Sequence, residues 1–213
     1  MHRLTPGLYV ITEDQDLEFD ELLVKTQTIL GCNVSALQYR KKNSPYSQRV
    51  SEASELKELC RDYKTKFIIN DDIELAMEIN SDGIHLGEDD ITCQQARTML
   101  GDEKIIGISC YNDLNRAKQA YEESADYLAF GAMYATTTKQ KTKKASPELL
   151  VTAKQHFPVP LVAIGGITPE NCQPLLASGA DLLAVVNCVY HAKFPDKVIA
   201  NFYKQIKDNH ELI

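Results

Sequence analysis

The chain has 213 residues, of which 44% are apolar, and its formal net charge is −7 at pH 7. This size suits one buried core, as in α/β barrels that form a single domain, while the acidic balance argues against a general nucleic-acid partner. No apolar run approaches the roughly 20 residues of a membrane span, and the N-terminus lacks the apolar region of a signal peptide, so we expect one domain over residues 1–213 in a cytoplasmic protein without a membrane partner.

Short apolar runs rich in β-branched residues alternate with segments of helical periodicity along the whole chain. Pro147 after Ser146, and Pro169 after Thr168, are typical of helix starts. The apolar runs lack clean alternation, as parallel strands covered on both faces do. Eight β-α units predict a (β/α)8 TIM barrel, with a doubly wound open sheet as the alternative. The predicted strands are residues 7–11, 35–39, 66–69, 83–86, 104–108, 127–130, 161–164 and 182–186.

Acids, bases, hydroxyls and glycines follow the predicted strands, whereas the strand starts carry no comparable set. In a (β/α)8 barrel the active site forms on the loops at the carboxyl ends of the strands. We therefore expect these residues to converge on one rim. They include Gln38, Tyr39, Arg40, Lys41, Lys42, Asn70, Asp71, Asp72, Glu88, Asp89, Asp90, Ser109, Gly165, Gly166 and Asn187.

Two acidic clusters end neighbouring predicted strands, so Asp71 and Asp90 can face each other across the barrel mouth. Two carboxylates in this position suit Mg2+, which takes one or two protein carboxylates and completes its shell with water and phosphate oxygens. The cation would remove the repulsion between them. Helix N-capping is the alternative, and we favour it for Asp72 and Asp89.

A polyanionic ligand would account for the basic residues. Gln38, Arg40 and Lys42 alternate at a strand end and so point to one side, into the mouth, where arginine supplies a planar fork for phosphate and lysine a point charge. The Gly165-Gly166 pair follows the seventh predicted strand, where barrels frequently bind phosphate through backbone N–H groups, although tight turns need glycine too. The sequence therefore predicts two anion sites, for two phosphorylated ligands or one long one.

The segment after the sixth predicted strand is long and rich in threonine and lysine. It is either a solvated basic loop or a lid that closes over anions, with hydroxyls and Lys139 reaching inward. We favour the solvated interpretation for the outer lysines. The polar residues of this segment are Thr136, Thr137, Thr138, Lys139, Lys141, Lys143 and Lys144.

Taken in order, these motifs resemble the thiamine-phosphate synthase family. The resemblance covers essentially the whole chain and implies a transferase that joins 4-amino-2-methyl-5-pyrimidinylmethyl diphosphate to 4-methyl-5-(2-phosphoethyl)thiazole, carboxylated or not. The products are thiamine phosphate and diphosphate, formed by a dissociative, Mg2+-assisted mechanism. The matching motifs are QYRKK (38–42), NDD (70–72), GIHLGEDD (83–90), GIS (107–109), YATTTK (134–139), AIGGIT (163–168) and AVVN (184–187).

The resemblance also implies a role for each matching residue. The pyrimidine diphosphate would be held by Gln38, Arg40, Lys42, Asn70, Ser109 and Lys139, and the expected substrate-binding set also includes Tyr39 and Lys41. The thiazole phosphate would be held by Thr136, Thr138, Gly165, Gly166 and the backbone at Val186 and Asn187, with Thr137 also in the substrate-binding set, and Mg2+ by Asp71 and Asp90. Arg40, Lys42, Ser109 and Lys139 form the implied catalytic set, which stabilises the leaving group without a protein nucleophile.

The sequence departs from the family pattern at two places and leaves three alternatives. Asn187-Cys188 stands where serine and a small residue are common, and Ala135 where proline is common. The alternatives are a thiazole tautomerase on the same barrel, a non-catalytic homologue and a phosphosugar isomerase. The intact metal and diphosphate residues favour the synthase. His85 either lines the pyrimidine pocket or is a hydrogen-bonded barrel residue, and the oligomeric state stays open.

Overall fold

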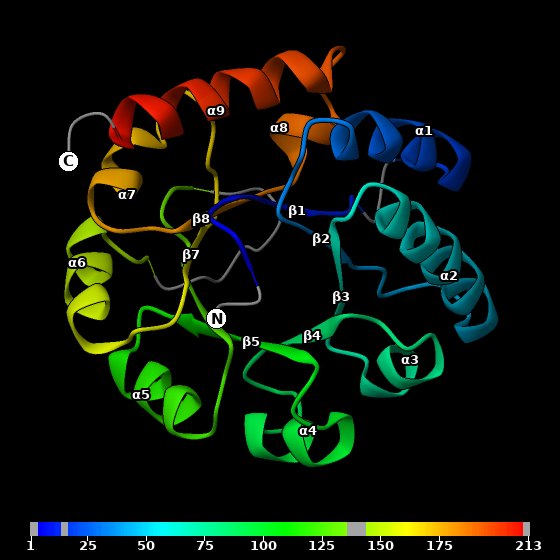
Figure 1. Ribbon diagram of the computed structural model, residues 1–213, viewed down its shortest axis with the longest axis horizontal. Helices are drawn as coiled ribbons and strands as arrows, with labels where there is room; N and C mark the ends of the chain where they lie inside the picture. Colours follow the sequence, from blue (N-terminus) through cyan, green and yellow to red (C-terminus); the bar gives the residue numbers. More distant parts are fainter. Residues whose placement is uncertain (1–3, 14–16, 136–143, 211–213) are drawn as a thin grey trace.

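Eight parallel strands pair in chain order, and β8 pairs with β1, so the sheet closes into a barrel (Figure 1). The structure, a computed structural model, describes residues 4–13, 17–135 and 144–210. The predicted (β/α)8 barrel is confirmed, and the alternative of an open sheet is wrong. The strands are β1 (Gly7–Ile11), β2 (Ala36–Tyr39), β3 (Lys66–Asn70), β4 (Gly83–Leu86), β5 (Ile105–Tyr111), β6 (Tyr127–Phe130), β7 (Leu161–Ile164) and β8 (Leu182–Val185).

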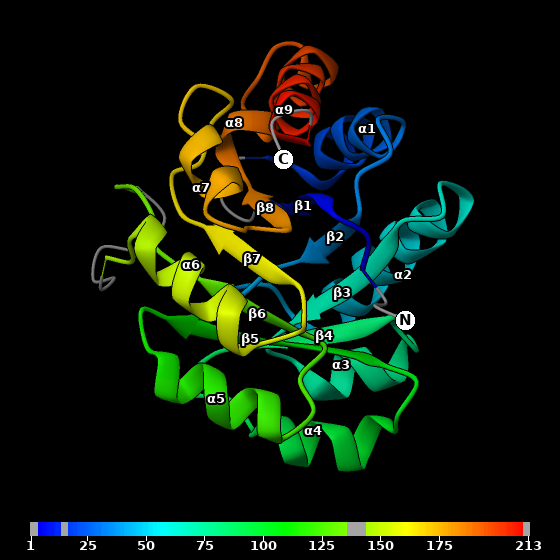
Figure 2. The same ribbon diagram turned by 60° about the vertical axis from the view of Figure 1, so that its left-hand side comes forward.

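The helices surround the strands as an outer layer (Figures 1 and 2). A short additional helix, α8, follows β8 directly, before α9 completes the outer layer. Within the described ranges, no helix combines the length and apolar character that crossing a membrane requires. The helices are α1 (Phe19–Leu30), α2 (Tyr46–Asp62), α3 (Ile73–Glu78), α4 (Cys93–Leu100), α5 (Leu114–Glu122), α6 (Pro147–His156), α7 (Gln173–Ala177), α8 (Asn187–Tyr190) and α9 (Pro195–His210).

One of the two predicted helix starts is confirmed and the other is wrong. Helix α6 begins at Pro147 as expected, but α7 begins only at Gln173. The intervening segment forms a turn, because the Asn171 side chain accepts a hydrogen bond from the Thr168 amide at 2.8 Å and donates one to the Gly166 carbonyl at 2.9 Å. These local side-chain bonds compete with a helix for the same backbone groups.

Successive residues of each strand face opposite sides of the sheet, so the strands bury two separate sets of side chains. On β1, for example, Leu8 and Val10 pack outward against the helices, whereas Tyr9 and Ile11 lie inside the barrel. Both sets are apolar over most of their length, which explains why the sequence shows no clean alternation. The buried interior residues are Leu4, Tyr9, Ile11, Ala36, Ile68, Ile105, Tyr127, Ala129, Val162, Leu182 and Ala184.

The glycine at position 107 makes room for an aromatic ring in the barrel interior. A Cβ atom added to Gly107 would lie 1.9 Å from the ring of Tyr127, which is fully buried. Any larger residue on β5 would therefore displace Tyr127. The absence of a side chain here lets that ring occupy the interior beneath the carboxyl ends of the strands.

Candidate active site

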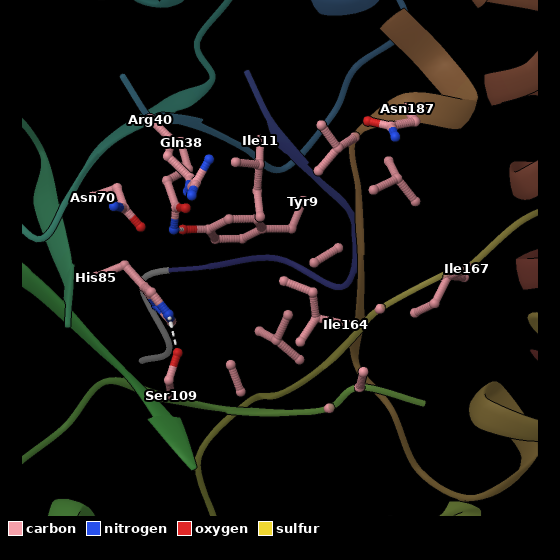
Figure 3. A pocket seen from close by; sticks show the side chains of 18 of the residues that line it. Tyr9, Ile11, Gln38, Arg40, Asn70, His85, Ser109, Ile164, Ile167 and Asn187 are labelled. Carbon is pink, nitrogen blue, oxygen red and sulfur yellow. Dashed lines mark hydrogen bonds between the residues drawn. The ribbon is translucent and has the colours of Figure 1, made fainter. Parts of the chain in front are cut away.

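A cavity of about 610 Å³ opens at the carboxyl ends of the strands, and every strand contributes a residue to its lining. This volume lies within the roughly 300–1,000 Å³ range of small-molecule sites. Figure 3 shows the polar side chains of Gln38, Asn70 and Ser109 toward one side, and the apolar Ile164 and Ile167 toward the other. The cavity therefore has a polar wall and an apolar wall.

The QYRKK motif divides between the cavity and the outer layer. Gln38, Arg40 and Lys42 line the cavity, as the alternation along an extended segment predicts. Tyr39 and Lys41 face the opposite way, toward α2. The Tyr39 hydroxyl donates a hydrogen bond to Glu52 Oε2 at 2.7 Å, and Lys41 Nζ lies 3.6 Å from Glu52 Oε1.

The structure thus corrects two of the expected substrate contacts. The side chains of Tyr39 and Lys41 do not line the cavity, and their partner Glu52 is itself buried. Adjacent residues of a strand cannot both point inward, so these two side chains fasten the strand to the helix layer instead.

Asp71 stands directly after β3, at the edge of the cavity. Its backbone is in the left-handed region, with φ of 65°, and its amide donates to the carbonyl of His85 at 2.9 Å. Lys42 Nζ lies 2.8 Å from Asp71 Oδ2. Burial favours the neutral carboxyl, but hydrogen bonds with Lys42 and Asp90 outweigh it and hold the pKa of Asp71 below its usual value.

Asp90 approaches Asp71 from the loop after β4. Its Oδ2 accepts a hydrogen bond from the Gly87 amide at 2.6 Å. Burial raises the pKa of Asp90; the Gly87 amide lowers it, and the hydrogen bond with Asp71 raises it again, so that the net shift is upward. The two carboxyl groups therefore lie close enough to shift each other's pKa in opposite directions.

This pair of carboxyl groups fits a magnesium ion. A divalent cation can neutralise both carboxylates at once, and Mg2+ commonly takes one or two protein carboxylates. Among the residues that the structure places, no group of three or more His, Cys, Asp or Glu side chains could hold a metal. Asp71 and Asp90 would thus leave most positions around the ion to water and ligand oxygens.

Of the two neighbouring acids that were expected to cap helices, Asp72 and Asp89, only one does so. Asp72 caps α3, accepting from the Leu75 amide at 2.9 Å, and also bonds to Arg49 of α2. The expected capping role of Asp72 is confirmed. For Asp89 it is wrong, because α4 is capped by Thr92 through a reciprocal pair of hydrogen bonds with Gln95.

A chain of hydrogen bonds crosses the polar side of the cavity. Gln38 Nε2 donates to the Tyr9 hydroxyl at 2.9 Å, which lies 2.8 Å from the Tyr127 hydroxyl. His85 continues the chain, with Nδ1 2.9 Å from the Tyr127 hydroxyl and Nε2 2.8 Å from Ser109 Oγ (Figure 3). Burial raises the pKa of Tyr9 and of Tyr127, so both phenols stay protonated.

His85 lines the cavity and is hydrogen-bonded within the barrel at both ring nitrogens. Tyr9 and Tyr127 were missed by sequence reasoning. The alternation of side chains along the strands could have predicted them. Tyr9 shares its face of β1 with Ile11, and both line the cavity. A tyrosine at an inward position near a strand end presents its hydroxyl to the site.

The Gly165-Gly166 turn lies at the apolar wall. Both glycines have positive φ, at 104° and 63°. A Cβ on Gly166 would meet the Ala135 carbonyl oxygen at 2.4 Å, and the Gly165 carbonyl accepts from the Tyr134 amide at 3.0 Å. Both glycines line the cavity. The backbone of this turn is therefore exposed to a ligand without an intervening side chain.

Helix α8 begins at the same edge of the cavity. Val186, Asn187 and Cys188 all line it, with Val186 at the N-cap position of α8. A phosphate site between the loops after strands 7 and 8 and a short extra helix is frequent in this fold. The position expected for the second anion thus lies between the Gly165-Gly166 turn and the start of α8.

Part of the predicted site lies outside the described residues. This applies to Thr136, Thr137, Thr138 and Lys139, and to the outer residues Lys141 and Lys143. The described chain reaches Ala135, which lines the cavity, and resumes at Lys144, which is exposed and whose carbonyl accepts a hydrogen bond from Asn112.

The fold and the cavity define a class of (β/α)8 barrel enzymes that act on small phosphorylated molecules. The model of the thiamine monophosphate synthase family matches residues 8–189. The chain therefore belongs to the thiamine monophosphate synthase family, and the expected transferase of thiamine biosynthesis is confirmed.

Individual relatives agree with this assignment. The chain is 40% identical to a thiamine-phosphate synthase of Marinobacter nauticus over 99% of its own length and 95% of the relative's. It is 43% identical to the Xylella fastidiosa thiamine-phosphate synthase, covering 93% and 84%. Among solved structures, thiamine phosphate pyrophosphorylase from Pyrococcus furiosus superposes with a TM-score of 0.86 at 28% identity, covering 97% and 98% of the two chains.

Proposed function

We propose that this protein joins 4-amino-2-methyl-5-pyrimidinylmethyl diphosphate to 4-methyl-5-(2-phosphoethyl)thiazole, carboxylated or not, and that it does so by a dissociative mechanism with Mg2+ at Asp71 and Asp90. The observation that carries the proposal is the division of one cavity into two walls. Asp71 lies on one wall with Arg40 and Lys42, and Asp90 stands beside Asp71 just behind the lining, while a glycine turn lies on the other wall.

The first step breaks the bond between the pyrimidinylmethyl carbon and the diphosphate oxygen, and the electron pair leaves with diphosphate. Arg40 offers a bidentate fork to that diphosphate and Lys42 a point charge. When bound, Mg2+ would neutralise charge that develops on the leaving oxygens. The ion pair with Asp71 holds the Lys42 ammonium group beside the proposed metal site. Lys42 can therefore contact the departing diphosphate from that position.

The second step forms the bond between the thiazole nitrogen and the pyrimidinylmethyl carbon. The hydrogen-bonded chain from Gln38 to Ser109 would hold the polar edge of the pyrimidine, and Asn70 lies beside it in the cavity. Apolar side chains such as Ile164 would keep water from the cation between the two steps. No side chain needs to act as a nucleophile.

The remaining assignments are proposed on the same basis. Gly165, Gly166, Val186 and Asn187 would hold the thiazole phosphate, together with the threonines at 136–138, and Lys139 would contact the diphosphate. We propose that the reaction takes place in the cytoplasm, because all six cysteines are free thiols and such thiols persist in a reducing compartment.

The reaction itself is tested by mixing the two phosphorylated heterocycles with the protein, with and without Mg2+, and measuring thiamine phosphate by mass spectrometry. We expect product only when both substrates and the metal are present. Full activity in EDTA would refute the metal mechanism. Absence of product with every component present would refute the proposed function.

Tyr127→Phe should separate the role of the hydrogen-bonded chain from ordinary packing. Removing this hydroxyl breaks its two hydrogen bonds, with Tyr9 and with His85, so we expect the KM for the pyrimidine diphosphate to rise by about tenfold or more, since each buried hydrogen bond contributes about 1 kcal/mol. The matched control is Tyr190→Phe, which removes an equally buried hydroxyl bonded to Thr26 outside the cavity. Equal KM values for the two variants in steady-state assays would contradict this role.

Gly166→Ala should weaken the thiazole phosphate site. The new methyl group would collide with the Ala135 carbonyl oxygen and hold the turn away from its present position, so we expect the KM for the thiazole phosphate to rise at least tenfold while the KM for the pyrimidine diphosphate changes little. Gly101→Ala is the control, because it also has positive φ, at 77°, but no atom lies within 4 Å of the added Cβ. Equal effects on both substrates would contradict the assignment of the turn.

A further inference from the structure

Arg116, on α5, bridges the ends of two strands that carry site residues. Its Nε donates to the carbonyl of Ser109 at 2.6 Å, and its Nη2 donates to the carbonyl of Gly87 at 2.7 Å. A guanidinium group is planar, and its donors point in fixed directions. One side chain therefore sets the separation between the end of β5 and the loop after β4.

Each of the two bridged residues forms a hydrogen bond with a residue of the proposed metal site or of the hydrogen-bonded chain in the cavity. The Gly87 amide holds Asp90 Oδ2 at 2.6 Å. Ser109 Oγ bonds to His85 at 2.8 Å. A shift of the Gly87 peptide would therefore move a proposed metal ligand, and a shift of Ser109 would move the end of the hydrogen-bonded chain.

The regular pairing of β4 with β5 ends just before these two positions, at Leu86 and Ile108. The pairing of β5 with β6 shifts register between Ser109 and Tyr111, and a bulge of this kind interrupts the regular ladder. Tyr111 supplements the bridge, since its hydroxyl accepts from the Glu88 amide at 3.3 Å and its ring lies beneath the Arg116 guanidinium, 5.9 Å from the ring centre. The side chains of Arg116 and Tyr111 therefore connect β5 with the loop after β4 beyond the last paired residues.

We propose that Arg116 is a positioning residue that couples the metal-binding loop after β4 to Ser109, and so sets both the affinity for the divalent cation and the affinity for the pyrimidine diphosphate. It acts through the backbone, because Arg116 is not part of the cavity lining. The inference rests on the proposed function for its metal and its substrate.

Arg97 offers a matched control at the opposite rim of the same barrel. Its guanidinium donates to the carbonyls of Lys104, at 2.7 Å, and Ser124, at 2.9 Å, just before β5 and β6 begin. It also pairs with Asp126. The two arginines thus bridge backbone carbonyls in a similar way, but only Arg116 does so beside the cavity.

The experiment compares Arg116→Met with Arg97→Met in the full chain. Binding of Mn2+ in the presence of inorganic diphosphate is followed by electron paramagnetic resonance, and thermal unfolding is measured in parallel. We expect both variants to lower Tm, but only Arg116→Met to weaken Mn2+ binding, by about tenfold or more. Steady-state assays should show a matching rise in KM for the pyrimidine diphosphate, with the KM for the thiazole phosphate changed less than twofold.

Arg116→Lys extends the test if the methionine variant does not fold. Lysine keeps the positive charge but has no planar fork to hold both carbonyls, so we expect it too to weaken Mn2+ binding, by about threefold or more. Mn2+ binding equal to that of wild type in either folded Arg116 variant, or equally weakened in Arg97→Met, would overturn the inference. That outcome is distinct from failure of the proposed function, in which the wild type forms no thiamine phosphate.

Discussion

Replacing Asp71 or Asp90 by asparagine is expected to lower kcat/KM by roughly 10³-fold, which corresponds to about 4 kcal/mol of transition-state stabilisation from a metal ion. The two carboxyl groups lie close enough to shift each other's pKa and would jointly bind Mg2+. Asparagine is preferred to alanine because Asp71 has a φ of 65°, a conformation that asparagine tolerates better than most residues.

Asp89→Asn is the matched control for this experiment. Asp89 precedes Asp90 but is exposed, and it does not cap α4. We expect its steady-state parameters to stay within twofold of wild type. Circular dichroism should show the same fold in every variant. An Asp71→Asn, Asp90→Asn double variant that retains wild-type turnover would show that these carboxylates do not bind an essential metal.

Arg40→Lys is expected to lower kcat/KM for the pyrimidine diphosphate by roughly 10²-fold, because the loss of a bidentate, charge-assisted contact costs about 2–3 kcal/mol. Lysine retains the charge but not the fork. Arg40 lines the cavity on the same strand exit as Lys42, so the effect should concern the diphosphate. The KM for the thiazole phosphate should change less than twofold.

Lys41→Met provides the control for Arg40. Lys41 is the next residue along the chain, but it pairs with Glu52 on the α2 side and does not line the cavity. Its replacement should leave both KM values nearly unchanged. If Arg40→Lys weakens the two substrates equally, the assignment of the two anion sites to opposite walls is wrong.

Sequence periodicity located the strands closely. Four of the eight predicted strands coincide with the observed ones, and most others differ by one residue at an end. The main exception is β5, which continues to Tyr111 through the register shift after Ser109. A bulge depends on pairing with the neighbouring strand, and no local pattern of apolar residues records it.

The features of the site divide in the same way into those that the local sequence predicts and those that depend on distant segments. Asp71, Arg40 and Gly165 could be assigned to the cavity rim from the sequence, because each follows a strand and the carboxyl ends of parallel strands meet at one rim. The alternation of β2 predicts that the Tyr39 side chain points away from the cavity, although the sequence motif places Tyr39 among the expected substrate-binding residues. Its partner Glu52 lies on the next helix and could not be inferred.

The sequence by itself therefore determined the eight β-α units, the strand ends at which the chemistry lies and the identity of most groups there, because hydrophobic periodicity and order along the chain are local properties. Only the tertiary structure decided which groups touch. The contact of Asp71 with Asp90, the chain from Tyr9 through Tyr127 to His85, and the bridge from Arg116 all join residues on different strands or helices. Such contacts depend on the closure and register of the whole barrel, which no single segment encodes.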